Sequence, residues 1–141
     1  MITGHKLSLA SKHVNQMVNH LKKCYPEEAC GLLGGKDGFV EIVIPITNEL
    51  HSNKGYLMEQ NEQISVFNQF IEYNLSLAAI YHSHPFGEAT PSRRDIQENY
   101  YPDVYHLIWF LYNGIWQSRC YLLKDNNYLE VEIVFEEHKT Q

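Results

Sequence analysis

The sequence predicts an α/β fold, a mixed β-sheet covered by two or three helices, and three observations lead to it. The 141 residues suit one domain, since single cores usually span roughly 100 to 200 residues. Strand-like and helix-like segments interleave in the first two thirds of the chain, and strands follow one another in the last third. No linker, repeat or low-complexity tract divides the chain. We therefore expect one domain over residues 1–141, with a flexible polar tail at about 136–141.

The first expected elements are a short strand, a helix and two further strands. Residues 6–9 suit a leading strand, and Ser11 suits the N-cap of a helix. The helix has apolar residues at the spacing i, i+3, i+4, i+7, namely Val14, Met17, Val18 and Leu21. It ends at Tyr25-Pro26, because the residue before a proline is pushed out of the α region. Strands at 29–35 and 39–46 follow, joined by a Lys-Asp-Gly turn.

The middle of the chain predicts a second helix and a buried strand. A brief strand at 56–59 precedes a helix at about 62–74. The apolar face of this helix is expected at Ile64, Phe67, Ile71 and Leu75. Residues 77–81 are apolar on both faces, which is typical of a central strand. A polar loop at 82–91 and a short helix at about 92–99 follow.

The last third of the chain is expected to form antiparallel strands. Segments 104–112 and 115–124 flank Asn113-Gly114, which is the strongest short-range hairpin signal. In the final segment, apolar residues alternate with Glu130 and Glu132, so it suits an edge strand with one face in water.

Composition and charge exclude several classes of function. The chain has 11 Lys and Arg against 17 Asp and Glu, with no basic cluster, so we expect no nucleic-acid partner. The longest apolar run, 107–112, is far too short to cross a membrane, and the N-terminus does not resemble a signal peptide. Three widely spaced cysteines fit neither a disulfide framework nor a CxxC zinc site. We therefore expect a soluble cytoplasmic protein with no membrane partner.

The segment that carries chemistry runs from residue 81 to residue 95. His82 and His84 are two residues apart, so their side chains project to one side of an extended backbone and could share a small cation. Asp95, brought back by a loop that contains Pro and Gly, could complete three protein ligands. Two imidazoles, one carboxylate and a water form a catalytic zinc arrangement, and zinc acidifies such a water toward neutrality.

Other interpretations of these residues stay open at this point. A His-x-His pair can arise by chance among eight histidines, and Ser92 with Asp95 also fits a capping box at the start of a helix. Three acids could serve as a general base, namely Glu27, Glu28 and Glu88, and periodicity does not choose among them. The motif HExxH is absent, which excludes the common helical zinc-protease plan.

The complete pattern resembles the JAMM/MPN+ (JAB-type) zinc metallopeptidases. The string His82-x-His84-x7-Ser92-x2-Asp95 resembles their signature, and the segment PEEACGLLGG at 26–35 resembles their glutamate-bearing strand. The order of helices and strands also matches, over roughly residues 6–135. The resemblance implies an MPN/JAMM-like, cytidine-deaminase-like three-layer α/β fold, in which a mixed curled sheet has helices on both sides.

The resemblance also implies a role for each site residue. His82, His84 and Asp95 would bind one zinc ion per chain, with a water as the fourth ligand. Glu28 would act as general base and acid, and Ser92 would donate a hydrogen bond to the oxyanion of the tetrahedral intermediate. Between and beside these residues, Ser83 and Cys30 are expected to be structural.

The implied function is that of a stand-alone prokaryotic member of this family. Such an enzyme is a zinc-dependent amide-bond hydrolase, a metallopeptidase or isopeptidase that uses a zinc-activated water. The implied substrate is the C-terminal Gly-Gly tail of a ubiquitin-like or sulfur-carrier protein, and residues 100–102 could line its groove. Two alternatives remain: a non-catalytic MPN scaffold that mediates protein interactions, and a small-molecule amidase.

Overall fold

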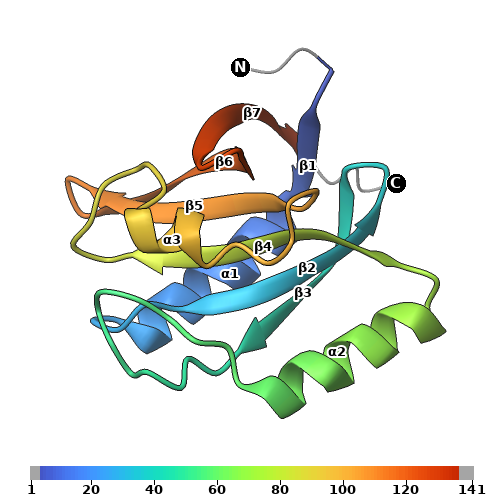
Figure 1. The fold of residues 1–141 in the computed structure, drawn as a ribbon, viewed down its shortest axis with the longest axis horizontal. Coiled ribbons are helices and arrows are strands. Elements are labelled where there is room, and N and C mark those ends of the chain that lie inside the picture. The colour runs from blue at the N-terminus through green and yellow to red at the C-terminus, as the bar shows by residue number, and fades with distance from the viewer. Residues whose placement is uncertain (1–3, 137–141) are drawn as a thin grey trace.

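Seven strands and three helices make up the computed structural model, which describes residues 4–136 (Figure 1). None of the helices within these residues is long and apolar enough to cross a membrane. Of the expected polar tail, residues 137–141 lie outside the described residues, and Glu136 is the last residue of the final strand. The elements in chain order are β1 (Lys6–Ala10), α1 (Ser11–Cys24), β2 (Cys30–Lys36), β3 (Phe39–Ile46), α2 (Gln60–Glu72), β4 (Ser76–His84), α3 (Arg93–Gln97), β5 (Tyr105–Tyr112), β6 (Ile115–Lys124) and β7 (Asn127–Glu136).

The sheet is mixed, as predicted, and it also closes on itself. Its strand order is β1-β3-β2-β4-β5-β6-β7, and β1 pairs in parallel with β7 to form a closed barrel. The prediction that the last strand lies at an edge is therefore wrong, because β7 pairs with β6 on one side and with β1 on the other. Its alternating glutamates mark a face that points to solvent, and such a face does not require an edge position.

Helix α1 packs against the inner face of this curled sheet. Its buried residues Met17 and Leu21 belong to one core cluster with side chains from all seven strands. The predicted apolar face of this helix is confirmed, although Ser11 is its first helical residue and Ala10 occupies the N-cap. Helix α2 packs on the opposite face of β2 and β4, where Val66 and Phe70 join a second cluster.

The predicted core face of α2 is wrong in part. Val66 and Phe70 are its buried residues, whereas Ile64 is 52% exposed and Ile71 is 77% exposed. The helix carries two apolar stripes, and the expected one, at Ile64, Phe67 and Ile71, turns its two isoleucines to solvent. Both stripes have helical spacing, so periodicity alone does not tell which one is buried. The strand expected at 56–59 is also wrong, because this segment forms an isolated bridge between Asn48 and Met58.

The predicted turns are confirmed by their backbone angles. Asn113 and Gly114, between β5 and β6, have φ values of 51° and 78°. Asp37 and Gly38, between β2 and β3, have φ values of 52° and 81°. Positive φ at both central residues characterises the type I′ turn, which matches the twist of the flanking strands.

Gly31 is expected to be essential for stability, because it faces Tyr81 on the neighbouring strand β4. A methyl group at Gly31 would collide with the Tyr81 ring, which is fully buried and hydrogen-bonded to His20 Nδ1 over 2.7 Å. Gly31→Ala should lower the free energy of unfolding by about 3 kcal/mol, the upper range for overpacking. Urea titration measures this loss. Gly114 has a positive φ but open space around it, so Gly114→Ala should lower the free energy of unfolding by only about 1 kcal/mol. Equal losses in the two variants would show that the clash with Tyr81 does not determine the effect of Gly31→Ala.

Candidate metal centre

Strand β4 delivers both histidines to one face of the sheet. The strand continues through His84, beyond the boundary at residue 81 expected from the sequence, and lies between antiparallel β2 and parallel β5. Alternation along the strand places His82 and His84 on the face of Ile80, which packs toward α2. His82 is fully buried and His84 nearly so. The predicted histidine pair is thus buried at the end of β4.

Helix α3 carries Asp95, the carboxylate of the predicted ligand set. Ser92 is its N-cap, and the predicted capping box with Asp95 is present. The Ser92 Oγ accepts from the Asp95 N–H over 3.1 Å, and the Ser92 N–H donates to Asp95 Oδ2 over 2.8 Å. The same Oδ2 atom lies 3.2 Å from His82 Nε2 and 3.0 Å from His84 Nε2. The two interpretations of Ser92 and Asp95, as a cap and as part of a metal site, are therefore compatible.

The three atoms form a triangle that suits a tetrahedral metal ion. The two Nε2 atoms lie 3.0 Å apart, so every edge of the triangle is 3.0 to 3.2 Å. Ligands at the usual distances from zinc are separated by about 3.3 Å in a tetrahedron, only slightly more. The His84 Nδ1 donates to the backbone carbonyl of Glu88 over 2.8 Å. This hydrogen bond leaves the lone pair of Nε2 directed into the triangle, as in many metal-ligating histidines.

Glu28, two residues before the start of β2, approaches the same histidines. One of its carboxylate oxygens groups with His82 and His84, all ligand atoms lying within 4.8 Å of one another. Its Oε1 is buried and has no hydrogen-bond partner within residues 4–136. Of the three glutamates considered from the sequence, Glu28 is the one that joins the histidine pair. Glu27 pairs with His51 at the surface, and Glu88 contributes its backbone carbonyl.

Two carboxylates thus flank the histidines, and their environments differ. Burial raises the pKa of Glu28, and the adjacent imidazoles only partly offset this effect. Burial would also raise the pKa of Asp95, but the His82 and His84 imidazoles beside it hold that pKa well below its usual range. An anionic oxygen at 3.0 to 3.2 Å from both Nε2 atoms suits a metal ligand. A more distant carboxyl with a raised pKa suits proton transfer. The two carboxyls thus differ in their distance from the histidines and in the direction of their pKa shifts.

Two residues that the sequence did not predict for the site, Asn48 and Tyr56, contact it. Asn48 is buried and donates from Nδ2 to the backbone carbonyls of Glu28, at 3.0 Å, and Gly55, at 3.2 Å. The Tyr56 ring lies against the His82 ring, with centroids 4.8 Å apart. No sequence pattern marks either residue, because both belong to a loop that is distant from residues 82–95 in the sequence and meets the site only in the folded structure. Ser83, which was expected to be structural, accepts a hydrogen bond from the Ala29 N–H over 2.8 Å. This bond links β4 to the residue that follows Glu28.

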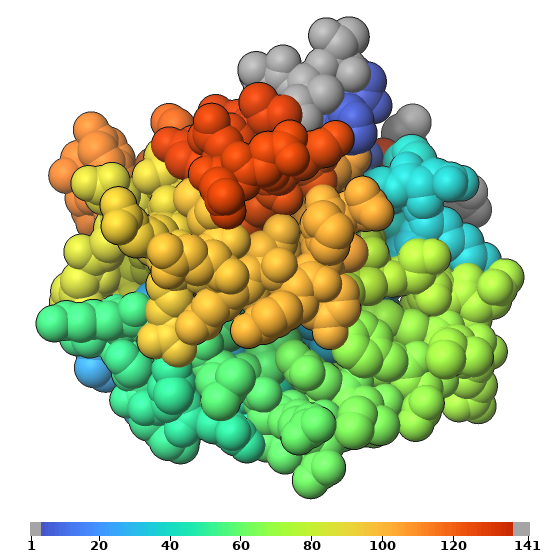
Figure 2. Space-filling view, in the orientation of Figure 1, coloured from blue at the N-terminus to red at the C-terminus, as the bar shows by residue number. Residues whose placement is uncertain are grey.

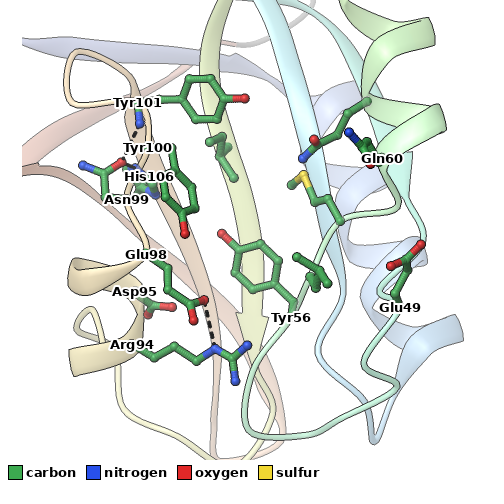
Figure 3. Close-up of a pocket in the computed structure, with 14 residues that line it drawn as sticks. Glu49, Tyr56, Gln60, Arg94, Asp95, Glu98, Asn99, Tyr100, Tyr101 and His106 are labelled. Atoms are coloured by element: carbon green, nitrogen blue, oxygen red, sulfur yellow. Dashed lines mark hydrogen bonds and ion pairs between the residues drawn. The ribbon is translucent and has the colours of Figure 1, made fainter.

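Two cavities lie beside the ligand triangle. One, of about 340 Å³, is lined by Glu28, His84 and Ser92 together with loop residues such as Lys54 and Phe86. The other, of about 330 Å³, is shown in Figure 3 and reaches Asp95. Its other lining residues are Glu49, Tyr56, Leu57, Met58, Gln60, Gln63, Ile80, Arg94, Glu98, Asn99, Tyr100, Tyr101 and His106. Tyr100 and Tyr101 line this cavity, in agreement with the prediction that residues 100–102 line a groove. Both cavities therefore border the triangle, one at Asp95 and the other at His84.

The chain is similar to known proteins along most of its length. The family model described as prokaryotic homologs of the JAB domain matches residues 10–119. The chain belongs to this family. The resemblance to JAB-type proteins predicted from the sequence is thus confirmed.

Named relatives and solved structures are similar to the chain as well. The chain is 35% identical over 108 residues to the CysO-cysteine peptidase of Mycobacterium tuberculosis, covering 75% of this chain and 74% of that protein. It is 42% identical over 81 residues to a probable TtuB-protein conjugate cleaving protease of Thermus thermophilus, covering 56% and 53%. The solution structure of protein DSY2949 from Desulfitobacterium hafniense has a TM-score of 0.84 at 29% identity, covering 94% of each chain. A JAB1/MPN domain protein from Archaeoglobus fulgidus, at 20% identity, has a TM-score of 0.57 over 91% and 99%, which supports the MPN-like fold.

Proposed function

We propose that this JAB-family protein is a zinc-dependent peptidase that cleaves the amide bond after the C-terminal Gly-Gly of a ubiquitin-like or sulfur-carrier protein. The observation that carries the proposal is the triangle of His82, His84 and Asp95 beside the buried carboxyl of Glu28. Family membership adds support, because the names of two relatives describe a peptidase and a conjugate-cleaving protease. We take residues 1–141 as a single domain of this kind, with one zinc ion.

The donor set fits zinc. His82, His84 and Asp95 would hold the ion through two imidazole nitrogens and one carboxylate oxygen, the mixture found in catalytic zinc sites. Three protein ligands leave the fourth position of a tetrahedron open. Zinc held by these three residues would act as a Lewis acid on the scissile carbonyl and would activate a water as the nucleophile.

In this proposal, Glu28 moves the proton. Its carboxyl is within reach of the histidine pair, and its buried Oε1 lacks a protein partner within the described residues. Such an oxygen can accept the proton of the attacking water and then deliver it to the leaving nitrogen. A pKa raised by burial favours both steps, because catalytic groups work best when their pKa lies near the operating pH.

In this proposal, Ser92 stabilises the carbonyl oxygen of the substrate. Its Oγ already accepts from the Asp95 N–H, so the hydroxyl proton remains available for donation. Ser92 also lines the cavity that contains Glu28 and His84. A preorganised donor at this position stabilises the negative charge that develops on the carbonyl oxygen during attack.

Removal of the Ser92 hydroxyl should impair turnover more than zinc binding. We expect Ser92→Ala to lower kcat by about 10² to 10³, the usual effect of losing one oxyanion donor. Zinc content, measured by elemental mass spectrometry, should stay near one per chain, because Asp95 and both histidines remain. Ser92→Thr, which keeps a hydroxyl that can both cap and donate, should retain most activity. A wild-type kcat in Ser92→Ala would rule out the donor role.

The substrate is tested by mass spectrometry of the products. A ubiquitin-like carrier protein extended after its Gly-Gly by one amino acid should lose the mass of that residue when incubated with zinc-loaded enzyme. An intact carrier, alongside hydrolysis of an unrelated small amide, would contradict the substrate and favour a small-molecule amidase.

We place this activity in the cytoplasm, which agrees with the three cysteines: all lie within the described residues and all are free thiols.

A further inference from the structure

The outer stripe of α2 has no part in the metal centre. Ile64 and Ile71 are two helical turns apart and share one face, on which both are more than half exposed. Phe67 lies between them and contacts the Tyr101 ring, with centroids 6.2 Å apart. This contact places the stripe next to the segment that carries Tyr100 and Tyr101. Single exposed apolar residues are ordinary, whereas a contiguous group of them indicates an interaction site.

The stripe continues into the mouth of the cavity that reaches Asp95. Leu57, Gln60 and Tyr100 line this cavity, and Leu57 and Tyr100 are 52% and 80% exposed. Gln60 precedes Ile64 by one helical turn, and from Gln60 to Ile71 the helix extends about 16 Å. We call Leu57, Ile64, Ile71 and Tyr100 the apolar rim. Figure 2 shows the face on which α2 and the segment around residue 100 lie against each other.

The surroundings of the apolar rim are acidic. Residues 47–75 contain four glutamates, Glu49, Glu59, Glu62 and Glu72, and a single cation, Lys54. Three acids, Glu49, Asp95 and Glu98, line the cavity itself against one cation, Arg94, which pairs with Glu98 over 3.1 Å. A protein that covers this surface should therefore present an apolar patch bordered by lysine or arginine side chains, since complementary charge steers association and selects partners.

We propose that the apolar rim docks the folded body of the carrier protein whose tail is cleaved at the metal centre. The inference rests on the proposed function and names the surface that selects its substrate. We place the tail in the cavity that reaches Asp95; about four extended residues span about 14 Å at most, so the folded body that precedes the tail must contact the enzyme near the mouth of this cavity. The apolar rim begins at that mouth and provides the matching apolar surface.

The test compares a folded substrate with its isolated tail. The probes are a ubiquitin-like carrier extended after Gly-Gly by one amino acid, and a peptide of its last six residues with the same extension. We expect the wild-type enzyme to cleave the carrier with a kcat/KM at least about tenfold higher, since two or three well-packed contacts exceed 1.4 kcal/mol. Ile64→Asp and Ile71→Asp should remove this advantage by raising KM for the carrier, with kcat for the peptide unchanged.

A matched control separates the apolar rim from exposed apolar residues in general. Ile115 begins β6, away from α2, and is 64% exposed, so Ile115→Asp should keep the carrier advantage. KM for the carrier, but not for the peptide, should also rise with salt. Equal kcat/KM values for carrier and peptide in wild type, or an advantage that survives both α2 substitutions, would overturn the docking surface while leaving the peptidase intact. Failure of zinc-loaded wild type to cleave either probe would overturn the proposed function, and the docking surface with it.

Discussion

Replacement of Glu28 by glutamine is expected to lower kcat by about 10³ while the protein keeps its zinc. General acid–base groups contribute typically about 10² to 10⁴ to the rate, and Glu28 would serve in two successive proton transfers. Glutamine has nearly the same size and hydrogen-bonding reach, so the buried site should keep its shape. The measurement is kcat on the Gly-Gly-extended substrate together with zinc per chain.

The neighbouring residue provides the control for this experiment. Glu27 is adjacent in the chain but partly exposed, where it pairs with His51. Glu27→Gln should therefore keep a wild-type kcat. Retention of activity in Glu28→Gln would contradict its role as the proton carrier. Loss of zinc in that variant would instead identify Glu28 as a ligand, an arrangement that its position within 4.8 Å of both histidine ligand atoms makes a real alternative.

Asp95→Asn is expected to remove both zinc and activity. The substitution deletes the negative charge that lies 3.0 to 3.2 Å from both imidazoles. Loss of residues that merely support metal ligands weakens binding about 10- to 100-fold, so loss of a charged ligand should weaken it by at least about 100-fold. Zinc affinity is measured by competition with a chelator, and kcat/KM should fall in parallel at limiting zinc.

The capping role of Asp95 requires its own control. Asp95 also accepts from the Ser92 N–H, so its loss could disturb α3. Glu98→Gln alters another acid of the same segment, one that pairs with Arg94 over 3.1 Å at the surface, and should leave zinc affinity unchanged. Wild-type zinc affinity in Asp95→Asn would mean that the ligand set is wrong, whatever happens to activity.

Local signals predicted much of the fold because they depend on nearby residues. The Asn113-Gly114 turn adopts positive φ at both positions, and α1 ends at Cys24, just before Tyr25-Pro26. The helix face at Met17 and Leu21 is buried as its periodicity predicts. The resemblance to the JAMM signature grouped His82, His84, Ser92 and Asp95, and the structure brings these residues within hydrogen-bonding distances.

Features that depend on distant contacts were not predictable in the same way. The barrel closes because β1, near the start of the chain, pairs with β7, near its end. Which apolar stripe of α2 is buried depends on contacts with residues such as Leu32 and Ile80 from β2 and β4. Periodicity did not separate Glu28 from Glu27 and Glu88, and only the family resemblance singled it out, because the burial of each carboxyl depends on distant contacts. The contacts of Asn48 depend on the path of the loop that it holds.

The central claim is that zinc binds between His82, His84 and Asp95, and the most direct test is a crystal structure of the zinc-loaded protein with anomalous data at the zinc edge. We predict one anomalous peak per chain, about 2.0 to 2.2 Å from both Nε2 atoms and from Asp95 Oδ2, with the Glu28 carboxyl outside the coordination sphere. A peak bound by Glu28 and the two histidines, with Asp95 engaged only in its capping box, would contradict the account. So would the absence of any peak at this site in protein that contains zinc elsewhere.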